Sequence, residues 1–189
     1  MLNFAPVSTP MAQSSKLTSF DGTTLSTADT SSYRRLIGHL IYLTNTRPDI
    51  AFIVHTRRQF LFAPTTFHQQ AASRLLRYLK ANPGDDIFLP SKSSLQLRGF
   101  SDSDWATCPD TRKSITGYSI YLGDSLIFWK SKKQQTISCS SSEAEYRALA
   151  TTTCELQWLT YLLTNLHLIF TQLATLYCDN QSAMQIASN

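Results

Sequence analysis

The spacing of apolar residues changes near Gly84, and this change most restricts the folds open to the chain. Before Gly84, apolar residues recur at intervals of three and four, as in Leu36, Leu40 and Leu43, which is the repeat of an amphipathic helix. After Gly84 they alternate with polar residues, which is the repeat of a half-buried strand. The sequence therefore predicts a helical segment followed by an α/β domain.

The helical repeat predicts three helices between residues 31 and 81. The first ends at Arg47 because the following Pro48 disfavours helix at the residue before it. Pro48 can in turn open the second helix. Thr65 or Thr66 can cap the third, which ends before Pro83. Three short helices bury little surface, so we expect this segment to dock onto another part of the protein.

The alternating repeat predicts strands at about 86–90, 95–103, 115–122, 125–130, 134–139 and 173–178. A long helix is expected at about 141–166, and another from near Asn180. This order predicts an α/β domain with a mixed sheet. Residues 1–30 are rich in Ser and Thr without periodicity and are expected to form a flexible leader. The expected divisions are the leader, a helical segment at 31–92 and the α/β domain at 93–189.

Three acidic residues occupy related positions in the expected α/β domain. Asp102 and Asp179 lie at the ends of strands, and Glu145 lies in the first turn of the long helix. At about 100° per residue, Glu145 falls within the apolar stripe of that helix, whereas Glu143 falls on the solvent side. Each residue alone also has a simpler reading: a turn for Asp102, a capping box with Ser142 for Glu145, and a helix cap for Asp179.

The expected orientation of the first strand brings these carboxylates together. If Phe100 points toward the long helix, Asp102 lies on the same face of the strand, near Glu145. Asp179 follows a strand at the sheet edge where ligands collect in α/β folds. Carboxylates arranged in this way can hold two Mg²⁺ ions about 3.5–4 Å apart for phosphodiester hydrolysis. Oxygen ligands without His or Cys favour Mg²⁺ or Mn²⁺.

Basic residues exceed acidic ones by 17 to 13, giving a net charge of +4, which is compatible with a polyanionic partner. They are grouped along the chain, and each group is either a solvated face or a set of phosphate contacts. The candidate nucleic-acid contacts are Arg74, Arg77, Lys80, Arg112, Lys113, Lys132 and Lys133.

The four cysteines form no Cys-x-x-Cys pair, which argues against structural zinc, and no secretory segment opens the chain. The longest apolar run is too short to span a bilayer. We therefore expect a protein of a reducing compartment, cytoplasmic or nuclear, with no membrane partner and no small-molecule cofactor.

Six ordered motifs give the sequence a family resemblance. They are residues 33–51 (YRRLIGHLIYLTNTRPDIA), 76–80 (LRYLK), 101–106 (SDSDWA), 112–118 (RKSITGY), 129–134 (WKSKKQ) and 142–149 (SEAEYRAL). At these motifs the chain resembles the Pol polyprotein of copia-type LTR retrotransposons, from the end of the reverse transcriptase through the ribonuclease H. The resemblance covers about residues 30–189.

The resemblance implies a ribonuclease H-like mixed sheet preceded by a small helical connection segment. Asp102, Glu145 and Asp179 fall on the family's first three metal-binding carboxylates, which bind Mg²⁺ or Mn²⁺. The implied partners are an RNA–DNA hybrid and the parent reverse transcriptase.

The family's polymerase aspartates, fourth carboxylate, last strand and last helix have no counterpart in the sequence. We therefore expect a C-terminally truncated fragment with an incomplete two-metal site and weak or absent cleavage. The alternatives are a non-catalytic remnant that binds nucleic acid weakly and a host-adopted interaction protein.

Overall fold

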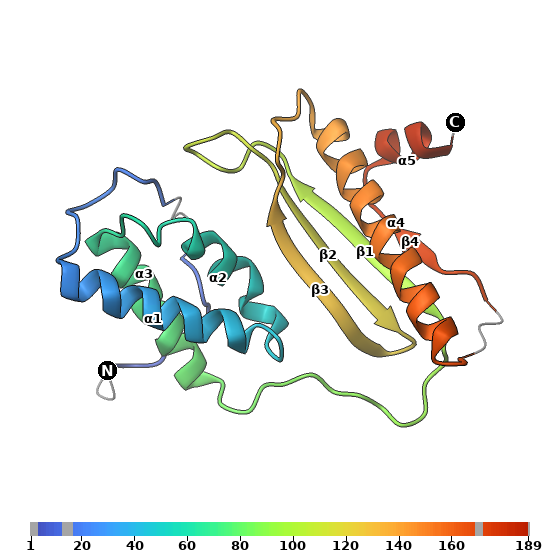
Figure 1. Ribbon diagram of the computed structural model, residues 1–189, viewed down its shortest axis with the longest axis horizontal. Helices are drawn as coiled ribbons and strands as arrows, with labels where there is room; N and C mark the ends of the chain where they lie inside the picture. The colour runs from blue at the N-terminus through green and yellow to red at the C-terminus, as the bar shows by residue number, and fades with distance from the viewer. Residues whose placement is uncertain (1–3, 13–16, 169–171, 189) are drawn as a thin grey trace. The chain divides into compact units, whose positions relative to one another are not determined.

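In the computed structural model of the chain, the described residues are 4–12, 17–168 and 172–188. The chain divides into two compact units, residues 1–86 and residues 87–189, each with its own internal packing (Figure 1). Among the described residues, no helix is both long enough and apolar enough to cross a membrane.

The first unit is helical, as the apolar repeat predicts. It contains α1 (Thr27–Leu43), the 3₁₀ helix η1 (Pro48–Ile50), α2 (Ala51–Arg58) and α3 (Thr66–Ala81). The first helix begins before the predicted position because the Ser26 side chain accepts a hydrogen bond from the amide of Asp29. Thr65 is the N-cap of α3, and its own amide donates to His68 Nδ1 at 2.9 Å. The core of this unit comprises Tyr33, Ile37, Leu40, Ile50, Ile53, Val54, Ala72 and Leu75.

The second unit is a four-stranded mixed sheet with helices, which confirms the predicted α/β class. Its strands are β1 (Leu97–Asp104), β2 (Ile115–Leu122), β3 (Ser125–Lys133) and β4 (Thr175–Tyr177), in the order β3-β2-β1-β4. The first three strands pair antiparallel, and β4 pairs parallel to β1. Helix α4 (Ser141–Asn165) lies along one face of the sheet, and α5 (Gln181–Ser188) packs against α4 (Figure 1). This arrangement is compatible with a ribonuclease H-like fold.

Two of the predicted strands do not form. Residues 86–90 make no ladder, since Phe88 and Leu89 are exposed and Pro90 lacks an amide donor. Residues 134–139 are irregular, and within this segment the Ser138 hydroxyl donates to Gln134 Oε1. The preceding strand, β3, extends instead to Lys133, three residues past its predicted end.

The face of β1 that packs on α4 is the opposite of the one predicted. Gly99 faces α4, where a Cβ would stand 2.9 Å from Leu156 Cδ1, so the missing side chain permits the close approach of the helix. Phe100, expected toward the helix, lies on the other face, where its ring stacks on Tyr177 at 4.9 Å. Asp102 shares the face of Phe100 because side chains alternate along a strand. The expectation that Phe100 and Asp102 face α4 is therefore wrong.

Candidate metal centre

The start of α4 separates the roles of its two glutamates. Ser140 caps the helix by accepting from the amide of Glu143, and Glu143 Oε2 accepts from the amide of Cys139 at 2.7 Å. This hydrogen bond is the main reason why the pKa of Glu143 lies below its usual range. Glu143 also pairs with Arg147 on the outer side of the helix. Glu143 therefore completes the cap, and the alternative that Glu145 forms a capping box with Ser142 is wrong.

Glu145 points inward, as its place in the apolar stripe predicts. Only 6% of the residue is exposed, and its Oε1 accepts a hydrogen bond of 3.1 Å from the amide of Ser103. This bond joins the first turn of α4 to the end of β1. Ser103 lies between Asp102 and Asp104 in β1, and the charges of both neighbours act on Glu145.

Glu145 lies in a cluster with two residues from the end of β4. One ligand atom from each of Glu145, Cys178 and Asp179 lies within 4.8 Å of the other two. Cys178 Sγ stands 3.9 Å from Glu145 Oε2. Asp102 is outside this group of three, although its charge acts on Glu145. The structure thus brings together two of the three predicted carboxylates and places the third close by.

The electrostatics of the cluster follow from burial and crowded negative charge. Burial raises the pKa of Glu145, and the charges of Asp102, Asp179 and Asp104 raise it further, against the opposing hydrogen bond from Ser103. Burial and the charge of Asp102 also raise the pKa of Asp104. Within the described part of the chain, no Lys or Arg forms an ion pair with these four carboxylates.

The donor set fits a divalent cation. A buried carboxylate without a basic partner is unfavourable unless it is protonated or bound to a cation. Glu145, Asp179 and Asp102 offer the hard oxygens that Mg²⁺ and Mn²⁺ prefer, and Cys178 adds a softer donor. The Mg²⁺ or Mn²⁺ site at Asp102, Glu145 and Asp179 stays a prediction.

Three residues at this site were not among those predicted from the sequence. Asp104 could have been found from the strand period, because it shares a face with Asp102. Cys178 directly precedes Asp179 but lacks the spacing by which cysteine ligands are recognised. Gln134 carries no sequence signal, yet its Nε2 lies 2.9 Å from the Ala144 carbonyl oxygen and 3.3 Å from Ser103 Oγ. It ties the start of α4 to the end of β1.

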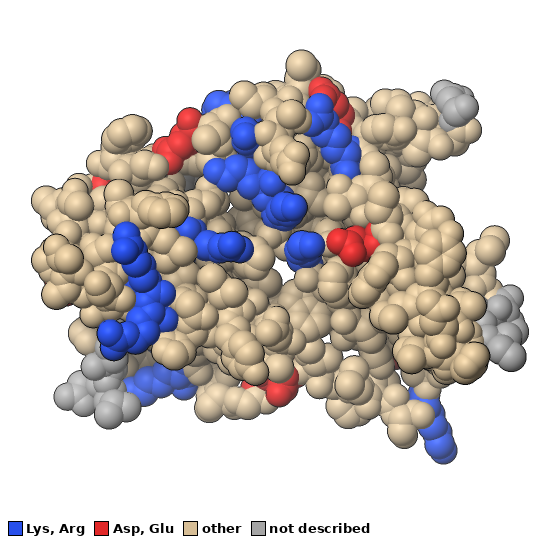
Figure 2. Space-filling model, viewed as in Figure 1, with Lys and Arg blue, Asp and Glu red and all other residues tan. Residues whose placement is uncertain are grey.

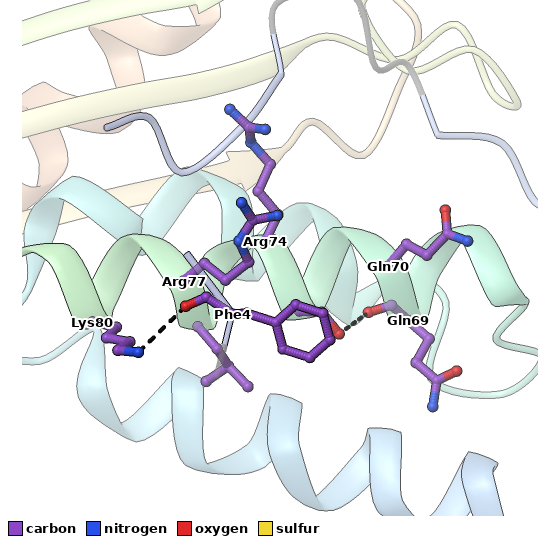
Figure 3. A pocket seen from close by; sticks show the side chains of 8 residues that line it. Phe4, Gln69, Gln70, Arg74, Arg77 and Lys80 are labelled. Carbon is purple, nitrogen blue, oxygen red and sulfur yellow. Dashed lines mark hydrogen bonds between the residues drawn. The ribbon is translucent and has the colours of Figure 1, made fainter. Parts of the chain in front are cut away.

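The predicted nucleic-acid contacts of α3 face the N-terminal segment of the first unit. Arg74 donates to Thr9 Oγ1, Arg77 to the Ala5 carbonyl, and Lys80 to the Phe4 carbonyl, at 2.8, 2.7 and 3.3 Å. Phe4 and all three basic residues line a cavity of about 660 Å³. Figure 3 shows their side chains beside α3. Residues 4–9, part of the expected flexible leader, therefore accept hydrogen bonds from all three of these predicted nucleic-acid contacts. Their binding of nucleic acid stays a prediction.

The other predicted contacts belong to the second unit. Arg112 is exposed and Lys113 half-buried in the connection between β1 and β2. Lys132 is exposed near the end of β3, and the amine of Lys133 donates to Cys108 Sγ at 3.2 Å. Figure 2 shows Lys and Arg side chains gathered around the end of β3 and the start of α4.

Comparison with known proteins identifies the family. The retrovirus-related Pol polyproteins from transposons RE1 and RE2 of Arabidopsis thaliana are 45% and 44% identical to this chain over its whole length. This chain belongs to the copia-type retrotransposon Pol polyprotein family. The Pol polyprotein from transposon TNT 1-94 of Nicotiana tabacum is 37% identical, again over the whole chain. The resemblance found in the six motifs is thereby confirmed.

This Pol segment spans only a small part of those relatives: 13% of RE1 and RE2 and 14% of TNT 1-94. No protein-family model matches the chain. No solved structure matches it either. The family is therefore established by sequence similarity over the whole of this chain.

We predict that Glu145→Gln stabilises the metal-free chain at neutral pH and that the gain shrinks on acidification. Folding raises the pKa of Glu145. The stability that depends on protonated Glu145 is therefore fully present below the unfolded pKa and is lost as the pH rises through the folded pKa. Glutamine removes this loss and keeps an oxygen for the Ser103 amide. Thermal unfolding of both proteins in EDTA, from about pH 4 to about pH 8, will measure the difference. A difference that does not vary with pH would contradict the prediction.

Proposed function

We propose that this chain forms the metal-binding part of a ribonuclease H module that hydrolyses the RNA strand of RNA–DNA hybrids. The observation that carries the proposal is the buried Glu145, held by the Ser103 amide beside Asp179 and without a basic partner among the described residues. Membership of the copia-type Pol family supports it, since the ribonuclease H of that family acts on such hybrids.

In this proposal the carboxylates of Asp102, Glu145 and Asp179 hold the metal. Bound Mg²⁺ or Mn²⁺ supplies a Lewis acid that activates water and balances charge on the leaving oxygen. The Ser103 amide fixes Glu145 Oε1 and leaves Oε2 on the side of Cys178. Contacts with RNA 2′-hydroxyls and with hybrid shape would distinguish RNA from DNA. The reverse transcriptase of the same polyprotein would be the partner that produces the hybrid.

Cleavage of a labelled hybrid by the full chain tests this function. The substrate is an end-labelled RNA strand paired with DNA, incubated with Mg²⁺, with Mn²⁺ and with EDTA. We expect metal-dependent cuts in the RNA strand of the hybrid and none in a DNA duplex of the same sequence. A chain that is folded by circular dichroism and binds the hybrid, but does not cut it with either metal, would instead be a non-catalytic nucleic-acid binder.

A further inference from the structure

A basic groove separates the edge strand β3 from helix α4 in the second unit. Its volume is about 410 Å³. Four cationic side chains line it, three from β3 and one from α4: Lys130, Lys132, Lys133 and Arg147. The remaining lining residues are mainly polar, among them Gln134, Gln135 and Thr136, and include one acidic residue, Glu155. The metal-centre carboxylates are not part of this lining.

Two of the cations are held in place by acidic residues of α4. Lys130 Nζ lies 3.6 Å from Glu155 Oε1, and Arg147 lies 2.6 Å from Glu143 Oε1. Neither pair uses all the donors of its cation, because an ammonium has three N–H groups and a guanidinium has five. Lys132 is exposed, and its position on β3 puts it on the same face as Lys130. The cations of the groove therefore have more N–H donors than their acidic partners occupy.

The spacing and lining of these donors indicate a ligand with regularly placed negative charges. Lys130 and Lys132 are two residues apart on one strand, so their Cα atoms are roughly 7 Å apart, comparable to successive phosphates of an extended nucleic-acid strand. The only aromatic ring among the lining residues is that of Tyr118, which is buried and donates its hydroxyl to Glu155. No lining ring is free to stack on a base, so charge dominates recognition.

We propose that this groove binds the sugar–phosphate backbone of a single nucleic-acid strand, independently of base sequence. Ligand sites of roughly 300–1,000 Å³ take compact molecules, so this groove accommodates one or two nucleotides of one strand. The proposal extends the proposed function with a second contact for its substrate class. It does not require bound metal, because no carboxylate of the metal centre takes part.

Gln134 connects the groove to the metal centre. Its side chain lines the groove, and its Nε2 contacts Ser103 Oγ, Thr116 Oγ1 and the Ala144 carbonyl at 3.3, 3.1 and 2.9 Å. Ser103 and Ala144 neighbour the carboxylates Asp102 and Glu145. A strand lying in the groove would therefore continue toward the metal centre and help to hold a hybrid with a single-stranded extension.

Binding of fluorescein-labelled oligo-dT to the full chain in EDTA tests the proposal. Fluorescence anisotropy over a series of NaCl concentrations gives both the affinity and its salt dependence. Lys130→Gln with Lys132→Gln removes two groove cations. We expect affinity to fall about tenfold at low salt and the slope of log K against log salt to flatten by about 0.7 for each lost phosphate contact. The control, Lys92→Gln with Arg35→Gln, removes two exposed charges outside the groove and should change neither quantity appreciably.

Three results would overturn the proposal: no binding of oligo-dT, equal weakening by the groove and control variants, or an unchanged salt slope in the groove variant. Displacement of oligo-dT by poly-glutamate at equal charge concentration would assign the groove to an acidic peptide instead. Since EDTA removes divalent metal, this test is independent of hybrid cleavage. A chain that fails to cleave hybrids can still show the groove-dependent binding, and the reverse also holds.

Discussion

Replacing Asp179 with Asn will lower Mg²⁺-dependent cleavage of an RNA–DNA hybrid by about 10²-fold or more, since removal of even a supporting group in a metal site has effects approaching this size. Asp179 lies at the end of β4, within 4.8 Å of ligand atoms of Glu145 and Cys178. Asparagine keeps the size of the side chain but removes the charge that holds a hard cation. Initial rates over a range of Mg²⁺ concentrations will measure the loss and show how far added metal restores cleavage.

The matched control is Asp124→Asn, which makes the same chemical change in the turn between β2 and β3. The Asp124 side chain is 73% exposed and pairs with Arg98 at 3.2 Å, apart from the carboxylate cluster. We expect its cleavage rate to stay within about twofold of the wild type, since an exposed ion pair contributes little. Asp179→Asn should also abolish any rise in melting temperature that Mg²⁺ produces. Equal cleavage by Asp179→Asn and wild type would show that Asp179 is not a ligand.

The sequence predicted the parts of the site that depend on helical geometry. The apolar stripe separated Glu145 from Glu143, and the structure confirms their orientations, since Glu145 is buried and Glu143 pairs with Arg147. Helical periodicity is reliable here because α4 is long and lies on the sheet through one continuous face. The helices of the first unit were predictable for the same reason, with ends decided by the local capping residues Ser26 and Thr65.

The sequence could not decide which face of β1 meets the helix. Strand alternation gives two faces, and Phe100 made the wrong one look apolar. The face of β1 that contains Gly99 packs on α4, because the missing side chain lets Leu156 approach. This contact involves a residue of the helix and cannot be recognised from the strand sequence alone. Contacts between distant segments were equally hidden. Nothing in the residues of α3 indicates that Ala5 and Phe4 supply acceptors for Arg77 and Lys80.

Leu156→Ala will lower the free energy of unfolding of the second unit by about 2–5 kcal/mol, the usual loss for such a truncation in a core. Leu156 is 5% exposed and packs with Leu97, Ile120 and Leu159 between α4 and the sheet. The cavity opens directly over Gly99, which has no side chain to fill it. Urea unfolding followed by tryptophan fluorescence will isolate this unit, since all three tryptophans, Trp105, Trp129 and Trp158, lie in it.

Three further variants separate the effect of the cavity from a general loss of helix packing. Leu162→Ala removes the same atoms from the same helix at a position that is 39% exposed, so we expect a loss below about 1 kcal/mol. Gly99→Ala alone is expected to destabilise, because its Cβ would stand 2.9 Å from Leu156 Cδ1. In the Leu156→Ala background the same methyl group enters the vacated space, so the double variant should be more stable than the sum of the single losses predicts. Additive losses would show that Gly99 and Leu156 do not pack against each other, and that β1 meets α4 through other residues.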